Sequence, residues 1–387
     1  QEQHARYGYP GISHFVRHTR HSGAVPQISL VMGPAVAGIA YGPALTDFIF
    51  MVKKTSYMFI AGPPVVKSLI SEEVSEEDLG GSRIHTQVSG LVDLACENDQ
   101  DCIQRCKELL RLLPSNNREL PPVVATGDDP QRRDSTLADV LPASSTQPYD
   151  MFDIITRIVD RGYFFEIKPE YAPNLITCFA RLDGHTVGIV ANQPKVLGGG
   201  LDMNSADKGA RFMRFCDAFN IPIVNLVDTS GCLVGTKMER GGIIRHMAKL
   251  VYAHAEATVP QVRVLIRKAA PTGYWAMGNA AGGADLVFAW PSAEVGLIGV
   301  DAGMEAILSS APVKEMVAKA RDPDRLIGEM REEYQANLID LYKALPGRHA
   351  MDVIDPAETR PTLIRALNAL SSKRVELPRK KHEIIPQ

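Results

Sequence analysis

The sequence lacks the features that mark several common classes of protein. Its 387 residues carry a formal net charge of −3, so no basic excess supports binding to nucleic acid. No apolar run reaches the roughly 18 residues that a membrane-spanning helix requires. Neither a lysine-bearing phosphate loop nor a G-x-G-x-x-G motif after a strand is present, so neither an ATP site nor a dinucleotide site is indicated.

The cysteines show no pattern of a metal site or a disulfide framework. They are Cys96, Cys102, Cys106, Cys178, Cys216 and Cys232. With no C-x-x-C pair and no Cys/His cluster of zinc spacing, we expect no metal in this chain. His14 and His18 could share one helical face, but no carboxylate or cysteine accompanies them, which favours a solvated face. The pattern indicates reduced thiols at small core positions of an intracellular protein, cytoplasmic or from a mitochondrial matrix.

Two stretches of the chain, residues 25–62 (the first unit) and 259–299 (the second unit), look like copies of each other. Each opens with Val-Pro-Gln and a β-branched apolar run, then has a loop of small residues and an Ala/Gly-rich segment with an aromatic residue. Each continues with a second strand that holds an aspartate, Asp47 or Asp285, and a third apolar run that ends in Gly62 or Gly299. The sequence predicts one structural unit used twice.

The local shape of this unit suits one kind of chemistry. A buried strand enters a loop of Gly and Ala, where small residues let a ligand approach the backbone closely, and a helix leaves it. The first turn of a helix has N–H groups without intrahelical partners, and two of them aimed at one point form an oxyanion hole. Two copies suggest two holes, which suits a reaction in which two carbonyl oxygens gain charge. The alternative is that each loop is only a tightly packed strand–helix junction.

The length of the chain favours two α/β domains. We expect a first domain at 1–125, a linker rich in Pro, Ser, Asp and Arg at 126–148, and a second domain at 149–387. Because only residues 1–24 precede the first unit, the first domain is expected to be truncated at its N-terminus. Helices are predicted near 1–24, 99–113, 149–159, 205–218, 243–257 and over most of 312–370, with strands at 175–182, 186–191 and 221–227, a hairpin turn at Asp183-Gly184 and a Gly-rich loop at 231–242.

Further motifs extend over nearly the whole chain, in order. They are GPAVAGIAYGPALTDF, GGSRIHTQVSG, YDMFDIITRIVD, FARLDGHTVGIVANQP, NSADKGARFMRFCDAFNIPIV, GGIIRHMAKLVYAHAEATVP, AWPSAEV and DVIDPAETRPTLIRAL. With these motifs the chain resembles the carboxyltransferase (β) subunit of biotin-dependent acyl-CoA carboxylases, of the propionyl-CoA carboxylase and methylmalonyl-CoA transcarboxylase type. The resemblance implies two crotonase-like domains, each a superhelix of ββα turns, in a ring-shaped homohexamer. It also implies active sites shared between the first domain of one subunit and the second domain of another.

The chemistry of that family agrees with two holes. In the family, biotin is held on a carrier protein or domain and charged by a biotin carboxylase subunit. Carboxybiotin releases CO2, the ureido anion removes the α-proton of the acyl-CoA, and the thioester enolate attacks CO2. The cofactor is therefore the base, and none of the tempting side chains, Asp47, His85, Asp228 and Asp285, is expected to have that role.

The resemblance assigns roles to residues by position. The backbone N–H groups of Ala37 and Gly38 correspond to the thioester hole, and those of Thr272 and Gly273 to the hole for the biotin carbonyl. The remaining assignments are Gly33, Tyr41, Tyr274 and Trp275 for acyl-CoA, and Gly231, Gly241 and Gly242 for the biotin side.

Three positions depart from the family pattern. Ala37 replaces a glycine, and Pro271-Thr272 replaces Gly-Gly. The third is Trp275, at a position that resembles the wall of the acyl pocket, where its bulk favours short acyl chains. Pro271 cannot adopt a positive φ if the family's first glycine needs one. Two alternatives to a carboxylase or transcarboxylase subunit therefore stay open: the subunit of a biotin-dependent acyl-CoA decarboxylase, which shares these domains, and a catalytically inactive structural subunit.

Overall fold

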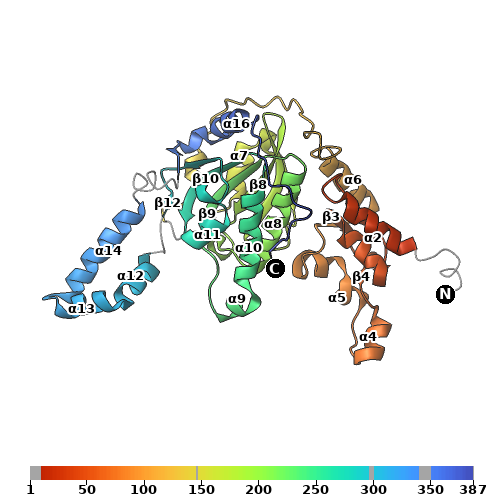
Figure 1. The fold of residues 1–387 in the computed structure, drawn as a ribbon, viewed down its shortest axis with the longest axis horizontal. Helices are drawn as coiled ribbons and strands as arrows, with labels where there is room; N and C mark the ends of the chain where they lie inside the picture. The colour runs from red at the N-terminus through yellow and green to blue at the C-terminus, as the bar shows by residue number, and fades with distance from the viewer. Residues whose placement is uncertain (1–9, 145–146, 296–299, 340–349, 387) are drawn as a thin grey trace.

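The structure is a computed structural model that describes residues 10–144, 147–295, 300–339 and 350–386. It is an α/β fold in which a larger and a smaller sheet lie side by side, and helical arms extend from both (Figure 1). In the smaller sheet, β1 (Ile28–Val31), β3 (Phe48–Val52) and β5 (Leu94–Cys96) are parallel, and β2 (Ala35–Val36) pairs separately with β4 (Met58–Phe59).

The larger sheet has eight strands. Its order is β13 (Asp352–Val353), β11 (Leu286–Ala289), β10 (Gln261–Ala269), β9 (Ile223–Thr229), β8 (His185–Asn192), β7 (Leu175–Leu182) and β6 (Phe164–Ile167), with β12 (Glu294–Val295) beside β10. The β6–β7 and β7–β8 pairs are antiparallel, and the pairs from β8 to β13 are parallel. Strands β7 to β10 are almost wholly buried because helices cover both faces, which explains their nearly continuous apolar sequences.

The helices are distributed over both sheets and the arms. They are α2 (Pro10–His21), α3 (Tyr41–Ala44), α4 (Pro63–Ile70), α5 (Glu76–Gly80), α6 (Asp99–Leu110), α7 (Phe152–Ile158), α8 (Met203–Ala218), α9 (Thr236–Gly241), α10 (Ile243–Glu256), α11 (Pro271–Ala276), α12 (Val300–Ser309), α13 (Ala311–Lys319), α14 (Pro323–Ile339) and α16 (Thr359–Ala369). Shorter helical turns are η1 (Ala37–Ala40), η2 (Ile84–Val88), η3 (Leu137–Val140), η4 (Asp160–Gly162), η5 (Leu197–Gly199), η6 (Ala280–Gly282) and η7 (Pro356–Glu358). No helix of the described residues is both long and apolar enough to cross a membrane.

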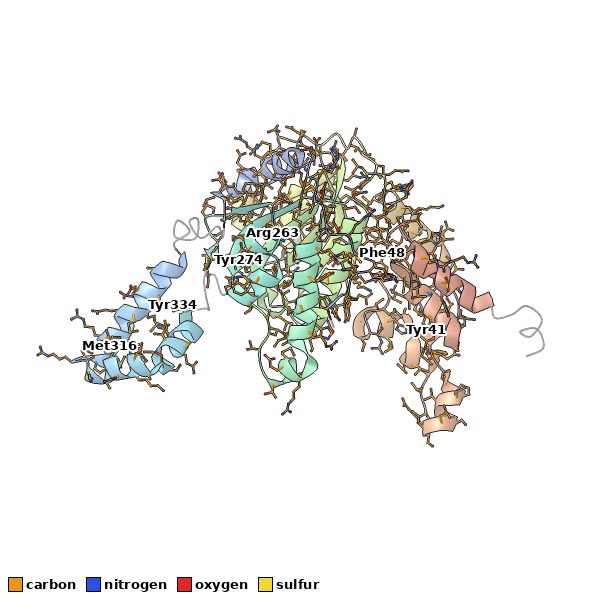
Figure 2. All side chains as sticks on the ribbon, in the orientation of Figure 1. Tyr41, Phe48, Arg263, Tyr274, Met316 and Tyr334 are labelled. Atoms are coloured by element: carbon orange, nitrogen blue, oxygen red, sulfur yellow. The ribbon has the colours of Figure 1, made fainter. Side chains whose placement is uncertain are left out.

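One apolar core joins the two sheets. The ring of Phe48, on β3, lies with its centroid 4.6 Å from that of Phe215 on α8 and 6.1 Å from that of Phe179 on β7. Figure 2 shows Phe48 between the smaller sheet and the body of the larger one. Helices α8 and α10 cover this face of the larger sheet, and α7 and α16 cover the other. The division into domains at residues 125 and 149 stays a prediction.

The predicted duplication is confirmed by strand order. In the first unit β1 pairs in parallel with β3, and in the second unit β10 pairs in parallel with β11. The next pairs also correspond, because β2 lies beside β4 and the end of β10 lies beside β12. The predicted end of the second unit at Gly299 lies outside the described residues.

The duplication extends to side chains. The backbone N–H of Gln27 donates to Asp47 Oδ2 at 2.8 Å, and Gln261 N–H donates to Asp285 Oδ2 at 2.7 Å. Each of these aspartates thus ties the first strand of its unit to the start of the next. A solvated face for His18 is wrong, because its Nδ1 lies 2.6 Å from Gln27 Oε1.

Most predicted elements are confirmed. Helices α6, α7, α8 and α10 and the β7–β8 hairpin lie where the sequence placed them. The Gly-rich loop at 231–242 is partly wrong, because it contains helix α9. Gly235 and Gly242, both with positive φ, flank α9. The intervening Lys, Met, Glu and Arg are good helix formers, so the glycines punctuate a helix there.

Candidate functional site

The second unit presents a pair of free N–H groups, Thr272 and Gly273, at the carboxyl end of β10. Helix α11 begins only two residues after the strand, with Pro271 at its first position. Proline has no N–H and suits this position, so Thr272 and Gly273 supply the remaining unpaired donors of the first turn. Within the described residues, neither N–H makes a hydrogen bond to a protein acceptor.

Close packing holds this second N–H pair against the end of β9. An added Cβ at Gly273 would lie 2.7 Å from Gly231 Cα and 2.9 Å from Thr229 Oγ1, so only glycine fits. Gly231 itself has φ +117. The N–H of Cys232 lies 3.4 Å from Thr272 Oγ1. Gly231, assigned to the biotin side from the sequence, is therefore brought against the second N–H pair.

The first unit presents the pair formed by Ala37 and Gly38. Strand β2 ends at Val36, whose backbone is extended, and η1 begins at Ala37. The bridge between Val36 and Phe59 directs the Ala37 N–H toward the carbonyl of Phe59, whereas the β2–β4 pairing provides no acceptor for the Gly38 N–H. An added Cβ at Gly38 would meet nothing within 4 Å. Ala37 has φ +56, whereas its counterpart Thr272 has a negative φ inside a regular helix, so the two loops present the same donors on different backbones.

The positive φ of Ala37 yields a testable prediction. A left-handed conformation costs an L-residue roughly 1–2 kcal/mol, while glycine adopts it freely but loses more entropy on folding. We expect Ala37→Gly to raise the free energy of unfolding by about 0.5–1 kcal/mol in denaturant titration and to retain activity. Ala44→Gly, in the right-handed helix α3 of the same loop, should lower it by a similar amount. If Ala37→Gly and Ala44→Gly change the free energy of unfolding in the same direction, the backbone at Ala37 is not strained.

The residues assigned to acyl-CoA lie unevenly around the pairs. Gly33, in the β1–β2 loop, has open space at its Cβ position, and the ring of Tyr41 is exposed. Trp275 is 60% exposed beside the second pair, whereas Tyr274 is only 1% exposed, and burial raises the pKa of Tyr274 to about 12. Of these two aromatic residues, Trp275 is the one that presents its ring at the surface.

Exposed apolar side chains flank both pairs. Ile39, next to the first pair, is 70% exposed, and Val234, on the loop that meets Thr272, is 87% exposed. Gly241 and Gly242 lie instead at the α9–α10 junction, where an added Cβ at Gly241 would lie 2.5 Å from Met203 Sδ. Their assignment to the biotin side stays a prediction.

The tempting acid–base side chains have structural partners. Asp228 is buried and forms a 3.1 Å ion pair with Arg267, and burial raises its pKa. The Nε2 of His85 lies 2.6 Å from the carbonyl of Met58, and its Nδ1 lies 2.9 Å from Ser89 Oγ. In the described residues, no group of three or more His, Cys, Asp or Glu side chains is arranged to hold a metal ion.

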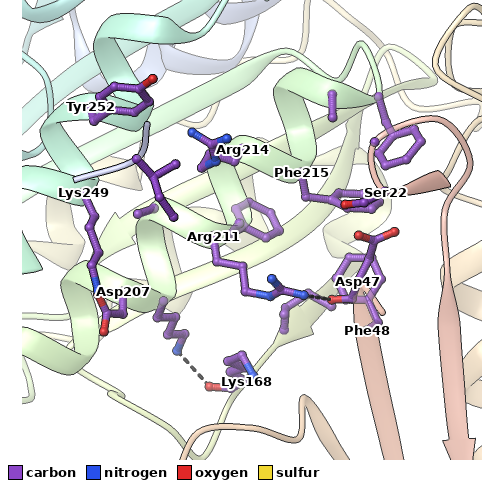
Figure 3. Close-up of a pocket in the computed structure, with 18 of the residues that line it drawn as sticks. Ser22, Asp47, Phe48, Lys168, Asp207, Arg211, Arg214, Phe215, Lys249 and Tyr252 are labelled. Carbon is purple, nitrogen blue, oxygen red and sulfur yellow. Dashed lines mark hydrogen bonds and ion pairs between the residues drawn. The ribbon is translucent and has the colours of Figure 1, made fainter. Parts of the chain in front are cut away.

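A cavity of about 520 Å³ lies elsewhere, between the two sheets (Figure 3). None of the four N–H residues lines it. Its basic side chains are already engaged: Arg211 donates to Thr46 O at 2.7 Å, and Lys208 Nζ donates to Lys168 O at 2.8 Å. Burial lowers the pKa of Lys208 to about 7. The cavity therefore lies at the junction of the two halves and contains neither N–H pair.

Known proteins resemble this chain in both sequence and structure. The family model "Carboxyl transferase domain" matches residues 7–385. The methylmalonyl-CoA decarboxylase subunit alpha of Veillonella parvula is 51% identical over 96% of this chain and 70% of its own length. The mitochondrial propionyl-CoA carboxylase beta chain of Sus scrofa is 46% identical over 98% of this chain and 68% of its own length.

A solved structure extends the likeness to three dimensions. A transcarboxylase 12S crystal structure, described as a hexamer assembly with hydrolysed methylmalonyl-CoA bound, has a TM-score of 0.92 at 44% identity, covering 97% of this chain and 71% of that one. The crotonase-like α/β fold expected from the resemblance is thereby confirmed. The chain belongs to the carboxyl transferase family and is a biotin-dependent acyl-CoA carboxyltransferase of the propionyl-CoA and methylmalonyl-CoA type.

Proposed function

We propose that this chain moves a carboxyl group between carboxybiotin and the α-carbon of a short-chain acyl-CoA, with one backbone oxyanion hole in each unit. The observation that carries the proposal is the repeated geometry: both units place two successive N–H groups at the start of a helical turn that follows a strand. Such donors act on oxygens that gain negative charge, and the loss of one costs roughly 3–4 kcal/mol of barrier lowering.

The chain's own groups would divide the work between the two substrates. The N–H groups of Ala37 and Gly38 hold the thioester oxygen of the acyl-CoA, and those of Thr272 and Gly273 hold the ring carbonyl of biotin. When bound, biotin supplies the carboxyl group and the basic nitrogen. The second loop suits such a ring, because the exposed side chain of Trp275 follows the two donors in the same helix; in this proposal Trp275 faces biotin and not the acyl-CoA to which the sequence assigned it.

The proposal extends to assembly and partners. Each N–H pair belongs to a different unit, and exposed apolar side chains flank both. We therefore propose a homohexamer whose sites join the first pair of one subunit to the second pair of another. A biotin carrier and a biotin carboxylase would be the partners, in the cytoplasm or a mitochondrial matrix. The likeness to a transcarboxylase described as a hexamer supports this.

Isotope transfer tests the function. The assembled protein, incubated with free biotin and methylmalonyl-CoA labelled in its free carboxyl group, should place the label on biotin and produce propionyl-CoA. A folded assembly that binds methylmalonyl-CoA without transferring label would instead support an inactive structural subunit. The 51% identity to a decarboxylase subunit alpha favours a second candidate, the subunit of a decarboxylase. That subunit would perform the same transfer, so the partner subunits that co-purify distinguish the two.

We also predict which groups do not set the pH dependence. Asp47 accepts the Gln27 N–H, and His85 is held by the carbonyl of Met58, so both have structural roles. We expect His85→Gln and Asp47→Asn to leave the shape of the pH–rate profile unchanged when α-hydrogen exchange of propionyl-CoA is followed. Loss of one pH-dependent limb in a normally folded variant would show that a protein side chain is the base.

A further inference from the structure

The helix of the second N–H pair is anchored at its opposite end by a buried arginine. Arg263, on β10, is fully buried, and its Nε donates to the carbonyl of Met277 at 2.8 Å. Met277 caps the C-terminus of α11, while Thr272 and Gly273 lie in its first turn. A cation at the C-terminal end of a helix interacts favourably with its dipole. Figure 2 shows Arg263 close to Tyr274 of this helix.

The guanidinium of Arg263 is itself held by neighbouring side chains. Arg263 Nη2 lies 2.6 Å from His254 Nδ1 and 3.0 Å from Gln261 Oε1. Burial, followed by the charge of Arg263, holds the pKa of His254 well below its usual range, so a neutral imidazole accepts the hydrogen bond. Gly278, at φ +73, lies so close that an added Cβ would overlap both Arg263 Nη2 and the His254 ring.

This anchor is costly if it serves stability alone. Within the described residues, Arg263 has no carboxylate at ion-pair distance, and its Nη1 and His254 Nε2 are buried without hydrogen-bond partners. A buried charge and unsatisfied polar atoms destabilise a fold relative to well-packed apolar side chains. Local departures of this kind are expected where function requires a fixed geometry.

In the first unit the equivalent position reaches the end of the helix only through a neighbouring threonine. Ser29 lies two residues after Gln27, as Arg263 lies two residues after Gln261. Thr46 Oγ1 lies 2.9 Å from Ser29 Oγ and 2.7 Å from the carbonyl of Pro43, in the last turn of α3. Ser29 thus contacts the residue that holds the C-terminal end of α3, whereas Arg263 holds the end of α11 directly.

We propose that Arg263 is a positioning residue for the second oxyanion hole. By holding the Met277 carbonyl, it fixes the axis of α11 and hence the direction in which the Thr272 and Gly273 N–H groups point. This inference rests on the proposed function, since it assigns Arg263 a role in that hole. Arg263 is buried behind the helix and acts through it, with no contact to substrate.

Kinetics of Arg263→Met in the assembled enzyme test this role, with methylmalonyl-CoA and free biotin as substrates. A shift of the donors by about 1 Å should lower kcat by on the order of 10²-fold. KM for methylmalonyl-CoA should be unchanged, because the first hole stays intact. Arg263→Lys keeps a cation at the end of α11 and should recover part of kcat.

Arg360→Met is the matched control. Arg360, on α16, is also buried and donates to Ile158 O at 2.8 Å and Asp160 Oδ1 at 2.7 Å, on the sheet face opposite α11. It should lower the melting temperature but leave kcat per folded chain unchanged. An unchanged kcat in Arg263→Met overturns the inference. If Arg263→Met does not assemble, Arg263→Lys and Arg360→Lys are compared instead. The inference then requires a lower kcat in Arg263→Lys than in Arg360→Lys. If Thr272→Pro loses activity but Arg263→Met keeps it, only this inference is contradicted. If Thr272→Pro keeps its activity, the proposed function is contradicted.

Discussion

Replacing Thr272 with proline is expected to lower carboxyl transfer by about 10²–10³-fold, the usual loss when one oxyanion donor is removed. The substitution deletes one N–H of the second pair. The helix should tolerate it, because Thr272 lies at the second position of α11 and the chain already begins α4 with Pro63 and Pro64 at the same two positions. The measurement is kcat for label transfer from methylmalonyl-CoA to biotin.

Thr272→Ala is the matched control, because it keeps the N–H and removes only the hydroxyl that lies 3.4 Å from the Cys232 N–H. Its kcat should stay within about tenfold of the parent, since one neutral hydrogen bond contributes roughly 1 kcal/mol. Circular dichroism and melting temperature should be similar for the two variants. Equal activity in Thr272→Pro and Thr272→Ala would remove the second N–H pair from the mechanism.

Replacing Gly38 with valine is expected to lower turnover by a similar factor of about 10²–10³ for a different reason. An added Cβ at Gly38 meets nothing within 4 Å, so the valine methyl groups would enter the open space beside the donors and keep the thioester oxygen away. Folding should be retained, because the φ of Gly38 lies outside the left-handed region. Carboxyl transfer at saturating methylmalonyl-CoA gives the measurement.

Gly38→Ala separates steric blockage from other effects of losing a glycine. Its single methyl group should cost less than the valine, so activity should fall in the order Gly, Ala, Val. The same change at Gly273 is a poor test, because an added Cβ would lie 2.7 Å from Gly231 Cα and would displace α11 itself. Full activity in Gly38→Val would exclude the first pair as the thioester site.

Much of the arrangement could be predicted from the sequence because the duplication repeats local signals. The Val-Pro-Gln openings, the apolar runs and the aspartates at Asp47 and Asp285 mark strand starts that pair in the same order in both units. Pro271 marks the first position of α11 for the same reason that proline favours any helix start. These features depend on residues close together in the chain.

The rest depends on contacts between distant residues. The alternation around Arg263 predicts only that its side chain faces opposite to those of Val262 and Val264, but both faces of β10 are buried. That Arg263 reaches the C-terminus of α11 depends on the position of the helix. Each unit has a histidine shortly before its Val-Pro-Gln motif: His18 lies nine residues before Gln27, and His254 lies seven residues before Gln261. This repeated histidine was the sequence feature that could have indicated the buried contacts around Arg263. The positive φ of Ala37 had no local signal, because alanine does not favour it.

The most direct test of two backbone oxyanion holes is an experimental structure of the assembled enzyme with acyl-CoA and biotin bound. We predict that the thioester oxygen lies about 2.7–3.1 Å from the backbone nitrogens of Ala37 and Gly38, and that the biotin ring carbonyl lies equally close to those of Thr272 and Gly273 of another subunit. Carbonyl oxygens held by side chains instead, with both N–H pairs facing water, would contradict it.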